Sequence, residues 1–242
     1  MTATHYINAA EDLRENAEQW AAYESKGNCV ILAGPGSGKT KTITIKIAKL
    51  LAEEVKSPRR VACITYSNGC VSELRARLRN LGIHDSSRIL ISTVHSFCLT
   101  ELVIPFAQLA GLAVPSPLVI APPSFANGLF AKAVFSVTDG TMKATSSLKT
   151  ACDKLRRTIP DKDSREWNTW NSPRHTAIVE QYEQELTGEG VIDFDGMVLA
   201  GLQLVVPSAN SFSLPSKRYL NRQYLPPLVV IWMNRPSTSN SL

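Results

Sequence analysis

The sequence lacks the features that mark secreted, zinc-binding or membrane-spanning proteins. Its five cysteines form no C-x-x-C pair and show no ligand-like spacing with the four histidines, so we expect neither a disulfide framework nor a zinc site. The N-terminal residues show no signal-peptide pattern. The most apolar stretch, residues 99–121, is interrupted by Glu101 and three prolines, whereas a spanning helix needs about 20 consecutive apolar residues. We therefore expect a cytoplasmic protein with reduced thiols and no membrane contact.

The composition is ordinary, and the charge balance is slightly basic. Charged residues make up 19% of the chain and apolar residues 44%, which are ordinary values for a globular protein. The net charge of +5 permits a polyanionic partner such as nucleic acid without requiring one. At 242 residues the chain can form one sizeable core, or one domain that carries an insertion.

The first hundred residues alternate between predicted strands and predicted helices. Short apolar runs at 29–33, 61–64 and 89–91 are typical of strands that are buried on both faces. Apolar residues at helical spacing follow the first two runs, at 39–55 and 71–81. This alternation predicts an α/β fold with a parallel sheet.

The pattern changes after residue 99. Residues 100–187 contain prolines and helical segments without strand–helix repeats, which predicts a mainly helical insertion. The strand–helix pattern returns over residues 188–234, where Leu228–Ile231 is the last predicted strand. Residues 235–242 are polar and low in complexity, which is typical of a disordered tail. We therefore divide the chain at these boundaries, with residues 1–99 as the first part of the α/β domain.

The strongest motif is a glycine-rich loop between a predicted strand and a predicted helix. Residues 33–40 read AGPGSGKT, the P-loop pattern with alanine in the first glycine position. Glycines allow consecutive N–H groups to face phosphate oxygens, and the next helix directs its positive N-terminus at the same anion. A glycine-rich turn without a ligand is the alternative, which the position between strand and helix disfavours. The predicted nucleotide-binding residues of the loop are Gly34, Pro35, Gly36, Ser37, Gly38, Lys39 and Thr40.

Two residues of this loop carry the expected chemistry. Lys39 is predicted to reach the β- and γ-phosphates of ATP as a point charge. Thr40 is predicted to place its hydroxyl on Mg²⁺. Both are our candidate catalytic residues, and Thr40 is the candidate metal ligand.

Four segments in order along the chain resemble UvrD/Rep-type superfamily 1 DNA helicases. They are Asn16-x-x-Gln19 with the AGPGSGKT loop, Thr65-Tyr66-Ser67-Asn68 with the helix after it, the TVHSFC run at 93–98, and the IDFD run at 192–195. A single match of this kind would be unspecific, but the ordered set is specific and covers residues 10–232. The resemblance implies a P-loop RecA-like parallel sheet with a helical insertion, and ATP-driven unwinding of DNA.

The resemblance also implies roles for individual residues. Gln19 would bind the hydrogen-bonding edge of adenine, because a side-chain amide can donate and accept hydrogen bonds at the same time. The alternative is an ordinary surface glutamine. The residues implied to contact single-stranded DNA are Thr65, Tyr66, Ser67, Asn68, Thr93 and His95. Hydroxyl and amide groups suit phosphate contacts and an aromatic ring suits base stacking. From local chemistry alone, a turn capped by Ser67 or Asn68 is as good an interpretation, and His95 is as often structural.

Two acidic residues in the fourth segment allow two interpretations. Asp193 and Asp195 could hold Mg²⁺ at the end of a strand, or they could have a structural or accessory role. Only two clearly apolar residues precede them, fewer than a buried strand needs. We therefore favour the structural role.

The sequence departs from the family after the last predicted strand. There the family has Asp-Glu-x-Gln, whose aspartate holds Mg²⁺ and whose glutamate activates water; this chain has Trp232-Met233-Asn234-Arg235. Trp-Met-Asn is encoded TGG-ATG-AAY, which contains the Asp-Glu codons GAT-GAA in another frame. Our hypothesis is a frameshift at this motif, with a second lesion, a natural truncation or chance as open alternatives. We therefore expect an incomplete sheet and a helicase fragment that cannot unwind alone. A non-catalytic ATP- and DNA-binding module with a protein partner, or a non-functional gene product, are the alternatives.

Overall fold

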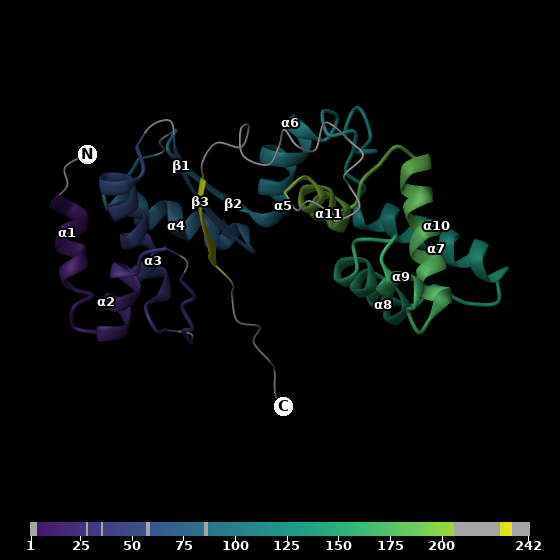
Figure 1. Cartoon of the computed structure of the whole chain (residues 1–242), viewed down its shortest axis with the longest axis horizontal. Helices are drawn as coiled ribbons and strands as arrows, with labels where there is room; N and C mark the ends of the chain where they lie inside the picture. Colours follow the sequence, from purple (N-terminus) through teal and green to yellow (C-terminus); the bar gives the residue numbers. More distant parts are fainter. Residues whose placement is uncertain are drawn as a thin grey trace. The chain divides into compact units, whose positions relative to one another are not determined.

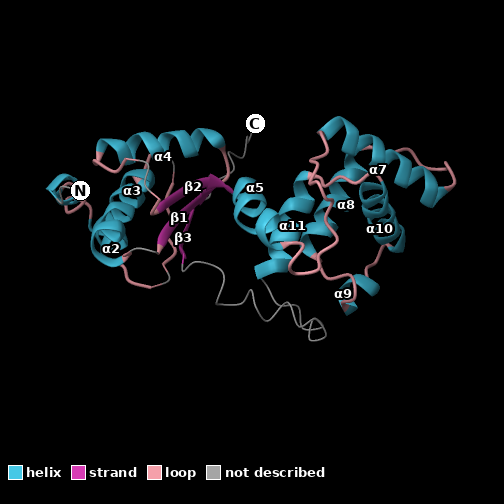
Figure 2. Ribbon diagram, turned by 90° about the horizontal axis from the view of Figure 1, so that it is seen from above, coloured by secondary structure: helices cyan, strands magenta, loops and turns pink. Residues whose placement is uncertain are grey.

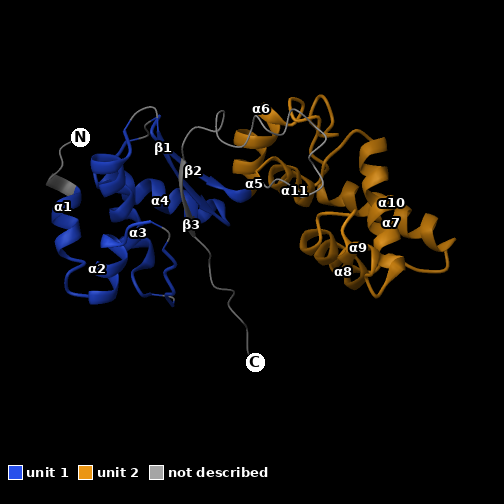
Figure 3. Cartoon of the chain, viewed as in Figure 1, with its two compact units in different colours: residues 1–94, 225–242 blue, residues 95–224 orange. Residues whose placement is uncertain are grey.

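The chain forms two compact units in its computed structural model. One consists of residues 1–94 and 225–242, and the other of residues 95–224 (Figure 3). The structure describes residues 4–27, 29–34, 36–56, 59–84, 87–205 and 228–233. The predicted tail at 235–242 and Pro35 of the glycine-rich loop therefore lie outside the described residues.

The first unit contains a parallel sheet with strand order β2-β1-β3 in the described residues (Figure 2). Its strands are β1 (Arg60–Thr65), β2 (Ile89–Thr93) and β3 (Leu228–Met233). Thr65 at the end of β1 pairs in register with Thr93 of β2 and with Met233 of β3. The carboxyl ends of all three strands therefore lie along the same end of the sheet, which we call its carboxyl edge. Parallel sheets place their ligand sites there.

Helices of this unit pack through apolar stripes, either against the sheet or against a neighbouring helix. They are α1 (Thr4–Glu11), α2 (Ala17–Glu24), α3 (Lys39–Lys49), the π-helical turn η1 (Leu50–Glu54) and α4 (Asn68–Asn80), visible in Figure 1. Ile47 of α3, Val61 of β1 and Leu74 of α4 belong to one cluster and have no exposed surface. A mixed helix and strand architecture with a small parallel sheet is thus confirmed.

One predicted strand is absent. Residues 29–33 have no regular secondary structure, and Val30 and Leu32 are 86% and 93% exposed. A strand needs a neighbouring strand whose backbone groups donate and accept hydrogen bonds along its edge. None of the described strands pairs with this segment. Both edges of β1 are already taken, by β2 and β3. The prediction of a buried strand before the glycine-rich loop was therefore wrong, whereas the apolar runs in β1, β2 and β3 do form the sheet.

The second unit is helical over its described part. Its helices are α5 (Val94–Phe97), η2 (Cys98–Val103), α6 (Ile104–Phe106), α7 (Pro123–Thr138), α8 (Ser146–Thr158), α9 (Arg165–Asn168), α10 (Pro173–Gly188) and α11 (Phe194–Val205). Phe130 of α7 and Tyr182 of α10 meet edge to face with ring centroids 5.6 Å apart. Leu155 and Ile178 fill the same core. None of the helices in the described residues is long and apolar enough to cross a bilayer.

Candidate nucleotide and nucleic-acid site

The glycine-rich loop leads directly into α3. Gly36 and Gly38 both have a φ of 78°, a left-handed conformation that favours glycine. Gly38 is the residue before α3, and Lys39 and Thr40 are the first two residues of the helix. The Ser37 hydroxyl donates to the carbonyl oxygen of Gly34 at 2.8 Å, which closes the loop on itself. The positive end of an 11-residue helix is thus directed at the loop.

Helix α2 brings Gln19 onto this loop. The Asn16 side chain caps α2 by accepting from the N–H groups of Glu18 and Gln19 at 3.1 and 3.0 Å. Gln19 Nε2 then donates to the carbonyl oxygen of Ser37 at 2.9 Å. A Cβ added to Gly38 would lie 2.6 Å from Gln19 Nε2, so the two elements are in close contact. Two segments that the sequence placed in the nucleotide site are therefore adjacent, and the adenine contact of Gln19 remains a prediction.

Lys39 and Thr40 have their functional groups available. Within the described residues, Lys39 makes no hydrogen bond or ion pair, and both side chains are half-buried. The carbonyl oxygen of Thr40 accepts from the Thr44 hydroxyl at 2.6 Å, which stabilises the first turn. No cluster of three or more histidine, cysteine or acidic side chains that could hold a metal ion occurs in the described part of the chain. A Mg²⁺ ion would therefore depend on the Thr40 hydroxyl and on phosphate oxygens.

The end of β1 presents one free aromatic ring. Thr65 is buried and ends the strand, whereas Tyr66 is 65% exposed. Ser67 caps α4, because its hydroxyl accepts from the Cys70 N–H at 3.3 Å. Asn68 is the exposed first residue of that helix. The structure therefore shows the capped turn at Ser67, and it leaves Tyr66 as the side chain most available for stacking.

The last two predicted DNA contacts lie in different units. Thr93 ends β2 opposite Thr65, at the carboxyl edge of the sheet in the first unit. His95 belongs to α5 in the second unit, where its ring packs edge to face on Phe194 at 5.5 Å between centroids. Phe194 is 49% exposed, so an apolar ring face remains open to solvent. We did not predict Phe194, although an aromatic residue in the IDFD run was the available signal.

The chain matches a known family over most of its length. Residues 15–219 match the model of the UvrD/REP helicase N-terminal domain. The chain belongs to this family. The resemblance inferred from the ordered motifs is thereby confirmed.

Similar curated proteins are much longer than this UvrD/REP N-terminal domain. The ATP-dependent DNA helicase PcrA of Staphylococcus epidermidis is 27% identical over 198 residues, which are 78% of this chain and 26% of the relative. PcrA of Staphylococcus aureus is 40% identical over 88 residues, which are 36% of this chain and 12% of the relative. The chain thus spans about a quarter or less of the length of these relatives.

In this UvrD/REP domain, Asp193 is engaged by other side chains. Its carboxylate accepts two hydrogen bonds from Arg156 Nη1, at 2.8 and 3.0 Å, and one from the Tyr182 hydroxyl at 3.0 Å. It also accepts from the Gly196 N–H at 2.8 Å, at the start of α11. Burial alone would raise the pKa of Asp193, but Arg156 and these donors outweigh it and hold the pKa below its usual value. These contacts support a structural role for Asp193.

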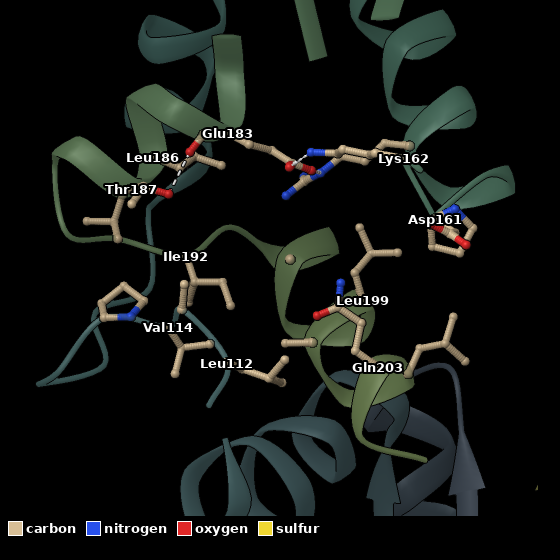
Figure 4. A pocket seen from close by; sticks show the side chains of 18 of the residues that line it. Leu112, Val114, Asp161, Lys162, Glu183, Leu186, Thr187, Ile192, Leu199 and Gln203 are labelled. Carbon is tan, nitrogen blue, oxygen red and sulfur yellow. Dashed lines mark hydrogen bonds and ion pairs between the residues drawn. The ribbon is translucent and has the colours of Figure 1, made fainter. Parts of the chain in front are cut away.

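A pocket in the second unit of the domain lies beside this network. Its volume is about 900 Å³, and Leu112, Val114 and Leu199 form part of its apolar wall (Figure 4). Three of the charged groups at its border are paired with one another, since Glu183 accepts from Arg156 Nε at 2.8 Å and from Lys162. The pocket was not predicted, because its lining comes from segments far apart in the sequence.

Proposed function

We propose that this chain binds Mg·ATP at the loop before α3 and single-stranded DNA at the carboxyl edge of the sheet. It would do so as the ATP-binding part of a UvrD/Rep-type helicase. The observation that carries the proposal is the hydrogen bond from Gln19 to Ser37, in a loop that continues into Lys39 and Thr40. Family membership makes ATP the expected nucleotide, since the curated relatives are named ATP-dependent DNA helicases.

Each residue of the site has a separate task in this proposal. The N–H groups at the start of α3 and the Lys39 ammonium would hold the β- and γ-phosphates. The Thr40 hydroxyl would bind Mg²⁺, which neutralises phosphate charge when present. Gln19 keeps its amide oxygen and one N–H for the adenine edge, because only one donor is used on Ser37.

Hydrolysis needs further groups that the chain does not offer at the end of β3. Trp232 and Met233 pair in register with Ile64 and Thr65, at the edge where a metal-binding aspartate and a water-activating glutamate would act. Neither position carries a carboxylate, and Asp193 is already engaged. We propose that this chain by itself is a binding module without efficient turnover.

We therefore expect binding without catalysis. Phosphate release from Mg·ATP, with a single-stranded oligonucleotide present, should be no faster for the natural chain than for Lys39→Ala. Loss of a general base alone costs about 10²- to 10⁴-fold in rate. A coupled phosphate-release assay measures this directly. ATP turnover by the natural chain that Lys39→Ala abolishes would contradict this expectation. It would show that other groups of the chain perform the roles of the missing aspartate and glutamate.

Tyr66 provides the test of DNA binding. We expect Tyr66→Ala to weaken binding of a fluorescent oligothymidylate by about 5- to 100-fold, because stacking contributes about 1–3 kcal/mol per base. Tyr66→Phe should bind as the natural chain does, since it keeps the ring. Phe135→Ala removes an aromatic ring that is 67% exposed in the second unit and is the matched control. Equal affinities for Tyr66→Ala and the natural chain, measured by anisotropy, would contradict the proposed DNA edge.

A further inference from the structure

Lys46 holds the C-terminal end of α2 on α3. Its ammonium donates to the carbonyl oxygen of Ala22 at 2.8 Å and to that of Ser25 at 2.6 Å. It also donates to the Ser25 hydroxyl. The last carbonyl groups of a helix have no partner within the helix and carry partial negative charge, so a cation there satisfies them and complements the helix dipole. Lys46 thus caps a helix other than its own.

Apolar packing also joins these helices, since Tyr23 of α2 and Ile45 of α3 share a buried cluster. The other charged contacts are those of Lys49 with Glu24 of α2, at 2.8 Å, and of Lys41 with Asp12, which lies before α2, at 3.2 Å. At least one partner of each pair is more than 40% exposed, and exposed pairs contribute about 0–1 kcal/mol. Lys46 is partly buried, and this burial lowers its pKa. Among the three lysines, Lys46 is the one that binds the carbonyl groups at the C-terminal end of α2.

Capping contributes to the position of α2, together with the buried cluster that Tyr23 shares with Ile45 of α3. It has eight residues, and an isolated helix shorter than about 12–15 residues is marginal in water. Asn16 caps its first turn and Lys46 its last, and Gln19 lies between them. Lys46 lies seven residues after Lys39 on α3, roughly 10 Å along the helix axis, so it is remote from the loop. Helix α3 therefore has two tasks. Its N-terminus forms part of the proposed phosphate site, and its Lys46 holds α2, the helix that carries Gln19.

We propose that Lys46 is a positioning residue for recognition of the nucleotide base. It touches neither the loop nor a bound phosphate, but it holds α2 so that Gln19 stays against Ser37 and faces the base. This inference rests on the proposed nucleotide site. Two parts of nucleotide binding then depend on different residues. Affinity for the phosphates depends on Lys39 and the loop, whereas preference for adenine depends on Gln19 and, through α2, on Lys46.

Affinities for Mg·ATP, Mg·ITP and inorganic tripolyphosphate test this. ITP keeps the purine and the phosphates but replaces the adenine amino group, so the ratio of the two Kd values reports on base reading. We expect Lys46→Met to lower the ATP preference about fivefold to tenfold, as Gln19→Ala does, because one hydrogen bond is lost. Tripolyphosphate affinity should change less than twofold. Lys46→Arg keeps the charge and several donors, so it should restore most of the preference.

The controls separate this inference from the proposed function. Lys132→Met, at an exposed ion pair in the second unit, should leave the preference unchanged. Lys46→Gln keeps a neutral donor and replaces Lys46→Met if circular dichroism shows that Lys46→Met is unfolded; we expect a smaller loss. No nucleotide binding by the natural chain would overturn the proposed function itself. Adenine preference that falls in Gln19→Ala but persists in Lys46→Met or Lys46→Gln would overturn the role of Lys46 alone. A natural chain that binds ATP and ITP equally would overturn both base reading by Gln19 and the role of Lys46, while leaving phosphate binding at the loop in place.

Discussion

Lys39→Ala should reduce the affinity for Mg·ATP about a hundredfold. Hydrogen bonds to charged groups contribute about 1.5–3 kcal/mol each, and Lys39 is expected to reach two phosphates. Within the described residues its ammonium has no other partner, so its removal should leave the fold unchanged. Displacement of a fluorescent ATP analogue measures the affinity, and the thermal unfolding midpoint checks the fold.

Lys39→Arg and Lys41→Met refine this test. Arginine keeps the charge but not the compact ammonium, so we expect only partial recovery of affinity. Lys41 lies two residues further along α3 and pairs with Asp12, so its loss removes one positive charge from the same region. A hundredfold loss in both Lys39→Ala and Lys41→Met would indicate a general effect of charge. An affinity of Lys39→Ala within threefold of the natural chain would contradict the phosphate-binding role.

Asp193→Ala should destabilise the second unit by about 3–5 kcal/mol. Removal of Asp193 leaves the buried Arg156 guanidinium with Glu183 as its remaining acidic partner, and the loss of one partner from a buried ion pair is costly in a protein interior. Arg156 is 5% exposed, and the Tyr182 hydroxyl and Gly196 N–H would lose their acceptor as well. Urea denaturation followed by circular dichroism measures the free energy of unfolding.

The double variant distinguishes the ion pair from loss of packing. Arg156→Met with Asp193→Ala should be less destabilised than the sum of the single variants, because the charge that loses Asp193 is then absent and Glu183 keeps Lys162. A loss below 1 kcal/mol in Asp193→Ala would show that Glu183 or entering water compensates the Arg156 charge. A destabilisation of the double variant equal to the sum of the two single variants would show that the two side chains act independently.

Acid should remove the same stabilisation. The pKa of Asp193 is lower in the folded chain than its usual value, so its contribution is present above about pH 4 and is lost as the pH falls through the folded-state pKa. Unfolding free energies between pH 3 and pH 7 should therefore fall less steeply in Asp193→Asn than in the natural chain. Identical slopes would contradict the role of Asp193 in acid sensitivity.

Local patterns predicted the glycine-rich loop and α3, but not the strand expected before them. Glycine positions and helical spacing are properties of a few consecutive residues, so they can be read without knowing the rest of the fold. Burial of residues 29–33 depends on pairing with a neighbouring strand, and none of the described strands pairs with this segment, although β2 and β3 each have an outer edge without a described neighbour. The apolar run at 61–64 has the same local character and is central in the sheet, with a neighbour on each edge.

Contacts between distant residues were also beyond the sequence patterns. Asp193 is paired with Arg156, which lies 37 residues earlier on another helix. Lys46 reaches Ala22, 24 residues earlier. No spacing rule connects such pairs, because they depend on how helices pack. At the end of β1, the capping preference allowed Ser67 or Asn68, and only the geometry shows that Ser67 is the cap.

Calorimetric titration of Mg·ATP into the natural chain, without DNA, tests the central claim most directly. We predict one binding site per chain, loss of binding when EDTA removes Mg²⁺, and competition by tripolyphosphate, because the loop and Lys39 hold the phosphates. Absence of binding at millimolar Mg·ATP by a folded chain, or binding that tripolyphosphate does not displace, would contradict a nucleotide site before α3.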